Sequence, residues 1–123
     1  MRILMIAMAA VVMFCAAASS EASASVQVSI SLASQRMNVS VDGAPYATWP
    51  ISTGRQGYGT PAGTYRPQSL RPFHRSSRYN WAPMPHSIFF TQVGHAIHGT
   101  DQIKRLGQPA SHGCVRLSRS TQR

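Results

Sequence analysis

A cysteine close to the end of the chain lies in the segment Ser111–Leu117, which reads S-H-G-C-V-R-L. His112 and Gly113 precede Cys114, and Arg116 follows it. A cysteine attacks as its thiolate, which nearby cations, imidazoles and backbone N–H groups stabilise. Gly113 would let the backbone approach a substrate and would direct N–H groups at a developing oxyanion. The segment therefore favours a thiol nucleophile, and we expect a lowered thiol pKa.

Two histidines could act as the general base for this thiol. His112 shares a face with Cys114 if their segment is extended, and His98 could approach from a neighbouring strand. The residues alone do not separate the two. A third group should orient the base. Asp101 or the backbone carbonyl of Gly99 could serve, since both follow His98 closely.

Zinc binding and a buried structural thiol are the alternatives to a nucleophile. Zinc would need about four N or S ligands, here His95, His98, His112 and Cys114. If residues 95–98 form a strand, His95 and His98 point to opposite faces and cannot share an ion. We therefore predict no metal site. The buried thiol, a common fate of free cysteines, stays open on the residues alone.

Residues 1–24 have the pattern of a secretory signal peptide. Arg2 is followed by sixteen apolar residues, fewer than the roughly 20 of a membrane-spanning helix, and Ala22–Ala24 forms an A-x-A cleavage pattern. Cys15 follows the bulky Phe14, which does not suit a lipoprotein site. We predict export to the periplasm or cell envelope, with no stable membrane span after cleavage. Cleavage removes Cys15 and leaves Cys114 unpaired where disulfides are usual.

The predicted mature domain, residues 25–123, is strongly basic. Removing Arg2 and Glu21 from the 12 basic and 3 acidic residues leaves 11 against Asp42 and Asp101, again a net charge of +9. Two acids far apart in the sequence argue against the paired carboxylates of a glycosidase. The charge indicates an anionic partner. Because the arginines are scattered and the chain is exported, we predict that this partner is not nucleic acid.

Alternating hydrophobicity predicts a strand-dominated domain. Apolar residues recur at every second position in two stretches: Val26, Val28, Ile30 and Leu32, then Met37, Val39 and Val41. Asp42-Gly43 predicts a tight hairpin turn, and a third strand is expected over residues 46–52. The Gly- and Thr-rich segment 53–64 is typical of turns and loops.

Residues 67–85 contain four prolines and show no periodicity, which predicts a long connection. Loops of more than about 12 to 15 residues often form lids or binding walls. His74 lies in this connection and His86 directly follows it, and we interpret both as surface or substrate-wall residues. Strands are expected to resume at residues 88–90 and 95–98.

I-H-G-T at Ile97–Thr100, followed by S-H-G-C-V-R-L, resembles the signature of the L,D-transpeptidase catalytic domain family (YkuD-like). The resemblance extends to Ser52–Tyr65 and to Y-N-W-A-P-M-P at Tyr79–Pro85, and so covers nearly all of the predicted mature chain from Val26. It implies a mostly β fold, an L,D-transpeptidase-like β-sandwich of mixed sheets with long loops. Family domains continue beyond R-L-S with a helix and a closing strand. We expect residues 25–123 to form a C-terminally truncated catalytic domain that lacks both.

The resemblance also implies an enzyme that needs no cofactor. Cys114 would be the nucleophile, His98 the general base, and Gly99 the residue whose carbonyl holds His98. Arg116 would bind a substrate carboxylate, which its planar guanidinium suits. The backbone N–H groups of Gly113 and Cys114 would line the oxyanion hole. Three residues would shape the site: Ser111, His112 and Gly113.

The implied reaction forms 3→3 cross-links in peptidoglycan, or attaches wall proteins to it. The sulfur would attack the third residue of a tetrapeptide stem, expected to be diaminopimelate, and D-alanine would leave. An amine would then resolve the thioester. If water is the acceptor, the protein is an L,D-carboxypeptidase; an inactive wall-binding relative is the remaining alternative. The predicted partners are stem peptides, whose carboxylates suit a basic protein.

Overall fold

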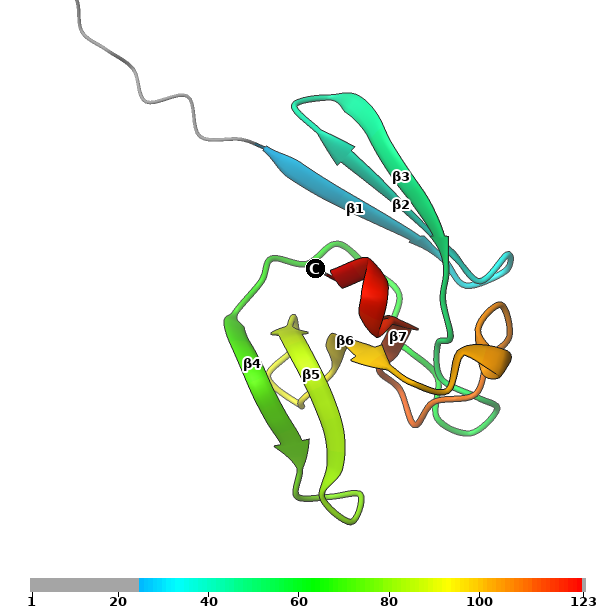
Figure 1. Ribbon diagram of the computed structural model, residues 1–123, viewed down its shortest axis with the longest axis vertical. Coiled ribbons are helices and arrows are strands. Elements are labelled where there is room, and N and C mark those ends of the chain that lie inside the picture. The colour runs from blue at the N-terminus through cyan, green and yellow to red at the C-terminus, as the bar shows by residue number, and fades with distance from the viewer. Residues whose placement is uncertain (1–24, 123) are drawn as a thin grey trace, which may run out of the picture.

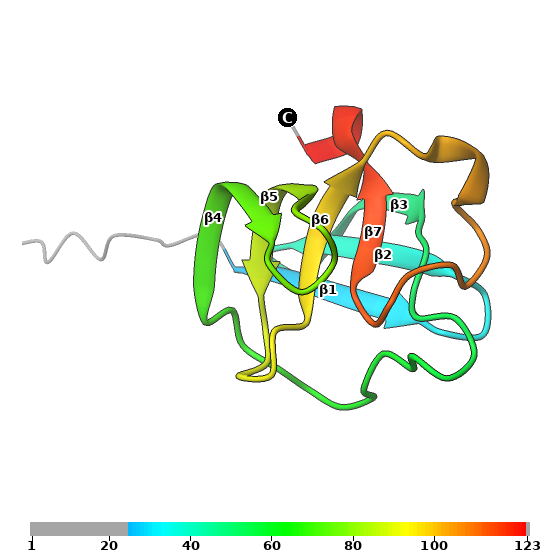
Figure 2. The same cartoon turned by 90° about the horizontal axis from the view of Figure 1, so that it is seen from below.

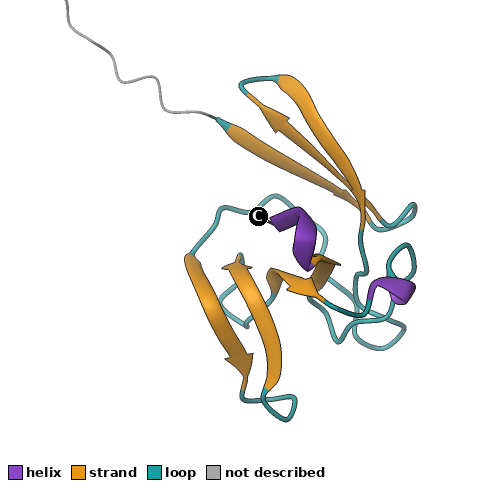
Figure 3. Cartoon of the chain, viewed as in Figure 1, coloured by secondary structure: helices purple, strands orange, loops and turns teal. Residues whose placement is uncertain are grey.

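The structure, a computed structural model, describes residues 25–122, which form two β-sheets and two short 3₁₀ turns (Figure 1; Figure 3). The predicted signal peptide lies outside the described residues. No helix within them is long and apolar enough to cross a membrane. The elements, in chain order, are β1 (Val26–Ser31), β2 (Arg36–Val41), β3 (Ala44–Pro50), β4 (Ser69–Ser76), β5 (Ala82–Phe89), β6 (Ala96–Thr100), η1 (Ile103–Arg105), β7 (Val115–Ser118) and η2 (Arg119–Gln122).

The first sheet is an antiparallel meander in the order β1-β2-β3. The turn between β2 and β3 is the predicted one: Asp42 and Gly43 both have positive φ, 51° and 79°. Two successive left-handed residues match the twist of a two-residue hairpin, which is why Asp-Gly is favoured there. The third strand, expected over residues 46–52, is β3.

The second sheet has the order β4-β5-β6-β7 and is mixed. Its first three strands pair antiparallel, whereas β6 and β7 run parallel. A parallel neighbour requires a crossover connection, and residues 101–114 provide it, with η1 near its start. The predicted fold class, mostly β with mixed sheets, is confirmed, and Figure 2 shows the two sheets as separate layers.

The prediction of a long connection over residues 67–85 is wrong, because β4 and the first half of β5 lie there as a hairpin. Prolines are tolerated where a strand needs no ladder N–H. Pro72 lies in β4, an edge strand. Pro83 and Pro85 lie in the part of β5 before Ile88, and β5 pairs with β6 only at Ile88 and Phe89. The prolines therefore removed the alternating pattern without removing the strands.

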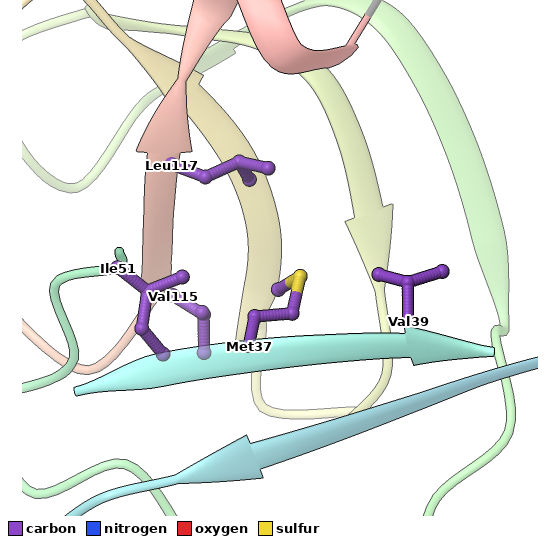
Figure 4. Packing of buried hydrophobic residues seen from close by; sticks show 5 residues of the cluster. All are labelled: Met37, Val39, Ile51, Val115 and Leu117. Atoms are coloured by element: carbon purple, nitrogen blue, oxygen red, sulfur yellow. The ribbon is translucent and has the colours of Figure 1, made fainter. Parts of the chain in front are cut away.

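The core lies between the two sheets. Figure 4 shows its members, which are buried apolar side chains from β2, β7 and the segment after β3: Met37, Val39, Ile51, Val115 and Leu117. The predicted alternation in residues 37–41 thus faces the core. Because successive side chains of a strand point to opposite faces, the inward position of Val115 and Leu117 directs Cys114 and Arg116 to the outer face of the second sheet.

Candidate active site

The parallel pairing of β6 with β7 brings three of the predicted site residues together. Ile97 pairs with Val115, and His98 pairs with Arg116. Ile97 and Val115 pack in the core, so His98 and Arg116 point to the opposite face. Cys114 directly precedes β7, and its alternation with Val115 places it on the same outer face. The imidazole, the thiol and the guanidinium therefore share one side of the sheet.

His98 is oriented by the backbone carbonyl of the next residue. Its Nδ1 lies 2.8 Å from the Gly99 oxygen. A carbonyl only accepts hydrogen bonds, so Nδ1 carries the proton and Nε2 is the nitrogen that can accept one. Asp101, the other predicted orienting group, is exposed and ion-paired with Arg119 at 3.4 Å. The structure therefore decides between the two in favour of Gly99.

Burial keeps the His98 imidazole neutral. The side chain is 6 % exposed, and burial lowers the pKa of His98 from 6.5 to about 4. The hydrogen bond to Gly99 opposes this shift, and the positive charges of Arg116 and His74 add to it. At neutral pH the His98 ring is thus neutral, with its one proton on Nδ1. Its Nε2 is therefore free to act as a base.

The thiol of Cys114 behaves differently from the expectation, since its pKa is raised rather than lowered. Burial raises the pKa of Cys114, and this outweighs the Ala96 backbone N–H and the Arg116 charge, which both lower it. The expected stabilising groups are therefore present, but desolvation at the edge of the core is the larger effect. At neutral pH the resting site therefore holds a thiol and a neutral imidazole on the same face of the sheet.

A tight turn precedes the cysteine and is closed by Ser111. The buried Ser111 hydroxyl donates to the Cys114 carbonyl at 2.5 Å and accepts from the Gly113 N–H at 3.1 Å. Gly113 has φ 120°, and a Cβ there would lie 3.1 Å from Cδ2 of His95. Glycine is thus favoured both by the backbone conformation and by the close His95 ring. In this structure the Gly113 N–H is occupied by Ser111.

The Gly- and Thr-rich segment, predicted only as a loop, holds this turn from the outside. Thr60 Oγ1 donates to the Gly113 carbonyl at 2.8 Å and accepts from the Gly54 N–H at 2.9 Å. The Arg55 N–H donates to the Ser111 carbonyl at 2.9 Å. Sequence reasoning did not single out Thr60 or Arg55, although both lie in the Ser52–Tyr65 stretch that carried the family resemblance.

His112 is held at the surface and not against the thiol. Arg55 Nη2 lies 3.3 Å from His112 Nε2, and the ring of Tyr79 stacks on the imidazole with centroids 4.4 Å apart and an interplanar angle of 13°. Arginine only donates, so the Nε2 lone pair of His112 is engaged. This leaves His98 as the histidine suited to accept the thiol proton.

The histidines of the zinc alternative do not form a ligand set. The expected separation of His95 and His98 assumed a strand over residues 95–98. The strand β6 begins only at Ala96, so His95 lies outside it and that reasoning does not apply. His95 instead lies against Gly113, with Nδ1 2.8 Å from Thr91 Oγ1. Within residues 25–122 no three His, Cys, Asp or Glu side chains come together as metal ligands would.

The two histidines interpreted as wall residues have different surroundings. His74 in β4 is half-buried, packs edge-to-face on Phe89 with centroids 4.9 Å apart, and lies close enough for its charge to affect His98. His86 is exposed and lines an apolar groove of about 380 Å³ between the sheets. Neither Cys114 nor His98 lines this groove, so it is separate from the candidate active site.

Comparison with solved structures shows the same fold in L,D-transpeptidases. The structure matches "L,D-transpeptidase from Mycobacterium smegmatis" with a TM-score of 0.73 and 25% identity, over 80% of this chain and 51% of that one. An L,D-transpeptidase from Mycobacterium tuberculosis H37Rv matches with 0.74 and 27%, over 78% and 49%. One from Xylanimonas cellulosilytica DSM 15894 matches with 0.68 and 28%, over 83% and 53%. The chain spans about half the length of these solved proteins.

No curated protein matches the chain. Comparison with protein families gives a match to YkuD, the L,D-transpeptidase catalytic domain, over residues 25–122. The match covers all of the described residues, including the parallel β6–β7 pair and the turn before Cys114. The chain therefore belongs to the YkuD L,D-transpeptidase catalytic domain family.

Proposed function

We propose that this protein is an exported cysteine L,D-transpeptidase that forms 3→3 cross-links between peptidoglycan stem peptides in the periplasm or cell envelope. Family membership supports the reaction class. One observation carries the proposal. His98, buried and neutral, has its Nδ1 fixed on the Gly99 carbonyl and shares a sheet face with Cys114. A base held in one tautomer on the same side of the sheet as the thiol is suited to take the thiol proton.

In the first half-reaction the Cys114 sulfur would attack the carbonyl of the third stem residue. Because the resting thiol is protonated, His98 Nε2 would take the thiol proton as the C–S bond forms. The imidazolium would then give this proton to the nitrogen of the departing D-alanine as the C–N bond breaks. The products are a thioester on Cys114 and free D-alanine, and no other reactant is needed.

The second half-reaction would transfer the acyl group to an amine of a second stem. His98 Nε2 would accept a proton from the attacking amine, and the sulfur would leave as the thiol. The oxyanion in both steps would be held by the Cys114 backbone N–H. The Gly113 N–H could join only after leaving Ser111 Oγ, to which it donates at 3.1 Å. Each such donor is worth about 3 to 4 kcal/mol in the transition state.

Arg116 would bind a carboxylate of the donor peptide. Its guanidinium is half-buried, which lowers its pKa, and it lies beside both Cys114 and His98. The only ion pair within the described part of the chain joins Arg119 to Asp101. A half-buried guanidinium with no acidic partner there would gain from a bound carboxylate.

Incubation with purified disaccharide-tetrapeptide muropeptides tests the proposal, with products separated and identified by mass. We expect dimers joined through two third residues, with release of D-alanine. Tripeptide products without dimers would mean that water is the acceptor, and would contradict transfer in favour of an L,D-carboxypeptidase. Unchanged tetrapeptide would support an inactive relative. Cys114→Ala is the matched control and should give neither product.

A further inference from the structure

A cluster of basic and aromatic side chains surrounds His112, two residues before Cys114, and the reaction described above does not use it. We infer that Arg55, supported by His112, forms a second anion-binding position that recognises a carboxylate of the donor peptide and thereby sets donor specificity. The inference rests on the proposed function for its substrate class. It adds to Arg116 a recognition residue that comes from the Gly- and Thr-rich segment.

Arg55 is tied to the turn that carries the nucleophile. Its backbone N–H donates to the Ser111 carbonyl at 2.9 Å, three residues before Cys114. Gly54 and Ser111 also form a parallel bridge. The backbone of Arg55 therefore keeps a fixed position relative to the catalytic turn, as a specificity residue requires.

The guanidinium of Arg55 is also held in place. Its Cζ lies 4.9 Å from the centroid of the Tyr58 ring, a cation–π distance. Its Nη2 donates to His112 Nε2 at 3.3 Å. The His112 ring is fixed in turn by the stack on Tyr79 and by the edge contact with Tyr58, whose centroid lies 4.9 Å away. Little side-chain entropy would be lost when a ligand binds to a group ordered in this way.

The cluster offers several hydrogen-bond donors and has no acid of its own. Arginine has five N–H donors, of which one points to His112. Since His112 Nε2 accepts from Arg55, the neutral ring carries its proton on Nδ1, which is a further donor. The two acids within residues 25–122 are engaged elsewhere: Asp42 accepts from the Ser25 N–H, and Asp101 pairs with Arg119. The chemistry that fits such a position is a carboxylate.

The two carboxylates of a tetrapeptide donor that lie nearest to the bond that breaks are the candidates: the side-chain carboxylate of the third residue and the terminal carboxylate of D-alanine. Amidation removes the charge of either group with almost no change in shape. Binding is measured by calorimetry on the Cys114→Ala variant, which separates recognition from turnover. The ligands are the free tetrapeptide and two analogues, one amidated at each carboxyl group.

In the Cys114→Ala background we expect one of the two amidations to weaken binding by about three- to tenfold, the range of an exposed charge-assisted contact. Adding Arg55→Gln should weaken binding of the free tetrapeptide by a similar factor. Binding of the analogue whose amidation mattered should not change further, so the preference for the free carboxylate disappears. Arg55→Lys should keep part of it. Arg36→Gln, which removes an exposed arginine from β2 in the other sheet, is the matched control and should keep it all.

If Arg55 only supports His112, Arg55→Gln weakens the binding of the free tetrapeptide and of both amidated analogues by the same factor. This result would overturn the inference. It is also overturned if neither amidation matters, or if the tetrapeptide does not bind to the Cys114→Ala variant. Failure of the proposed function is seen separately, as absence of product from the wild-type protein with muropeptides. Binding with an Arg55-dependent preference but without turnover would leave the inference standing.

Discussion

His98 donates from Nδ1 to the carbonyl oxygen of the residue that follows it, Gly99, over 2.8 Å. A histidine that is fixed by its own backbone needs no acidic partner, which suits a chain whose described part contains two acids, both placed elsewhere. The bond leaves Nε2 unprotonated, and burial keeps the ring neutral. The neutral imidazole and the protonated thiol on the same face of the sheet determine how reactivity and stability should respond to pH.

Acylation should persist into acidic solution. Because burial lowers the pKa of His98 to about 4, the base stays active until the pH approaches that value. The rate of Cys114 acylation by imipenem, a β-lactam with a strained carbonyl, should therefore fall with a midpoint near pH 4. Stopped-flow measurement between pH 3.5 and 8 gives the profile, with His112→Gln as the control. A midpoint near 6.5 would contradict the buried neutral base.

Folding stability should also fall as the pH is lowered from about 6.5 to about 4. In this window the unfolded chain binds a proton at His98 that the folded chain does not, so acid favours the unfolded state. A pKa difference from 6.5 to about 4 corresponds to about 3 kcal/mol once the pH is below both values. Urea unfolding of wild type and His98→Gln at pH 7 and below pH 4 measures it. An equal loss in both proteins would contradict the prediction.

Alkylation of Cys114 by iodoacetamide should show no plateau of high reactivity at neutral pH. Burial raises the pKa of the thiol, so the thiolate fraction and the alkylation rate should still be increasing at pH 9. Mass spectrometry of protein quenched over time gives the rate, and Cys114→Ser provides the blank. High reactivity that is constant from pH 6 to 9 would indicate a preformed thiolate–imidazolium pair instead.

Gly113 and Gly43 should respond differently to alanine. Both have positive φ, so each substitution costs about 1 to 2 kcal/mol of folding stability through backbone strain. At Gly43 a Cβ meets nothing within 4 Å, whereas at Gly113 it would lie 3.1 Å from the His95 ring. Gly113→Ala should therefore also slow acylation by at least about tenfold, because the turn that positions Cys114 must shift. Equal acylation rates in the two variants, at equal folded fraction, would contradict this role.

The local features of the fold could be predicted from the sequence, and the long-range ones could not. Asp42-Gly43 specifies its hairpin by backbone conformation alone, and the alternation at Met37 and Val39 identifies the face that packs in the core. The β4–β5 hairpin was missed because Pro72, Pro83 and Pro85 hide its pattern. Proline does not prevent a strand where one side of the strand has no partner, but which positions lack a partner on one side depends on the sheet.

The site shows the same division. The Gly99 carbonyl could be named as a holder of His98 because the two residues are adjacent. The contacts of Arg55, Tyr58 and Tyr79 with the turn before Cys114 join segments far apart in the chain, and no spacing in the sequence indicates them. The direction of the Cys114 pKa shift was missed for a related reason. Neighbouring charges are visible in a sequence, whereas the burial that outweighs them is not.

The central claim is that Cys114 takes up the acyl group of a stem peptide with His98 as its base. Intact-mass spectrometry of the folded protein, quenched in acid soon after mixing with disaccharide-tetrapeptide, tests it most directly. The account predicts an adduct with the mass of the tetrapeptide donor minus D-alanine. This adduct should be located on Cys114, strongly reduced in His98→Gln and absent in Cys114→Ala. An adduct that survives Cys114→Ala, or an equal adduct in His98→Gln, would contradict the account.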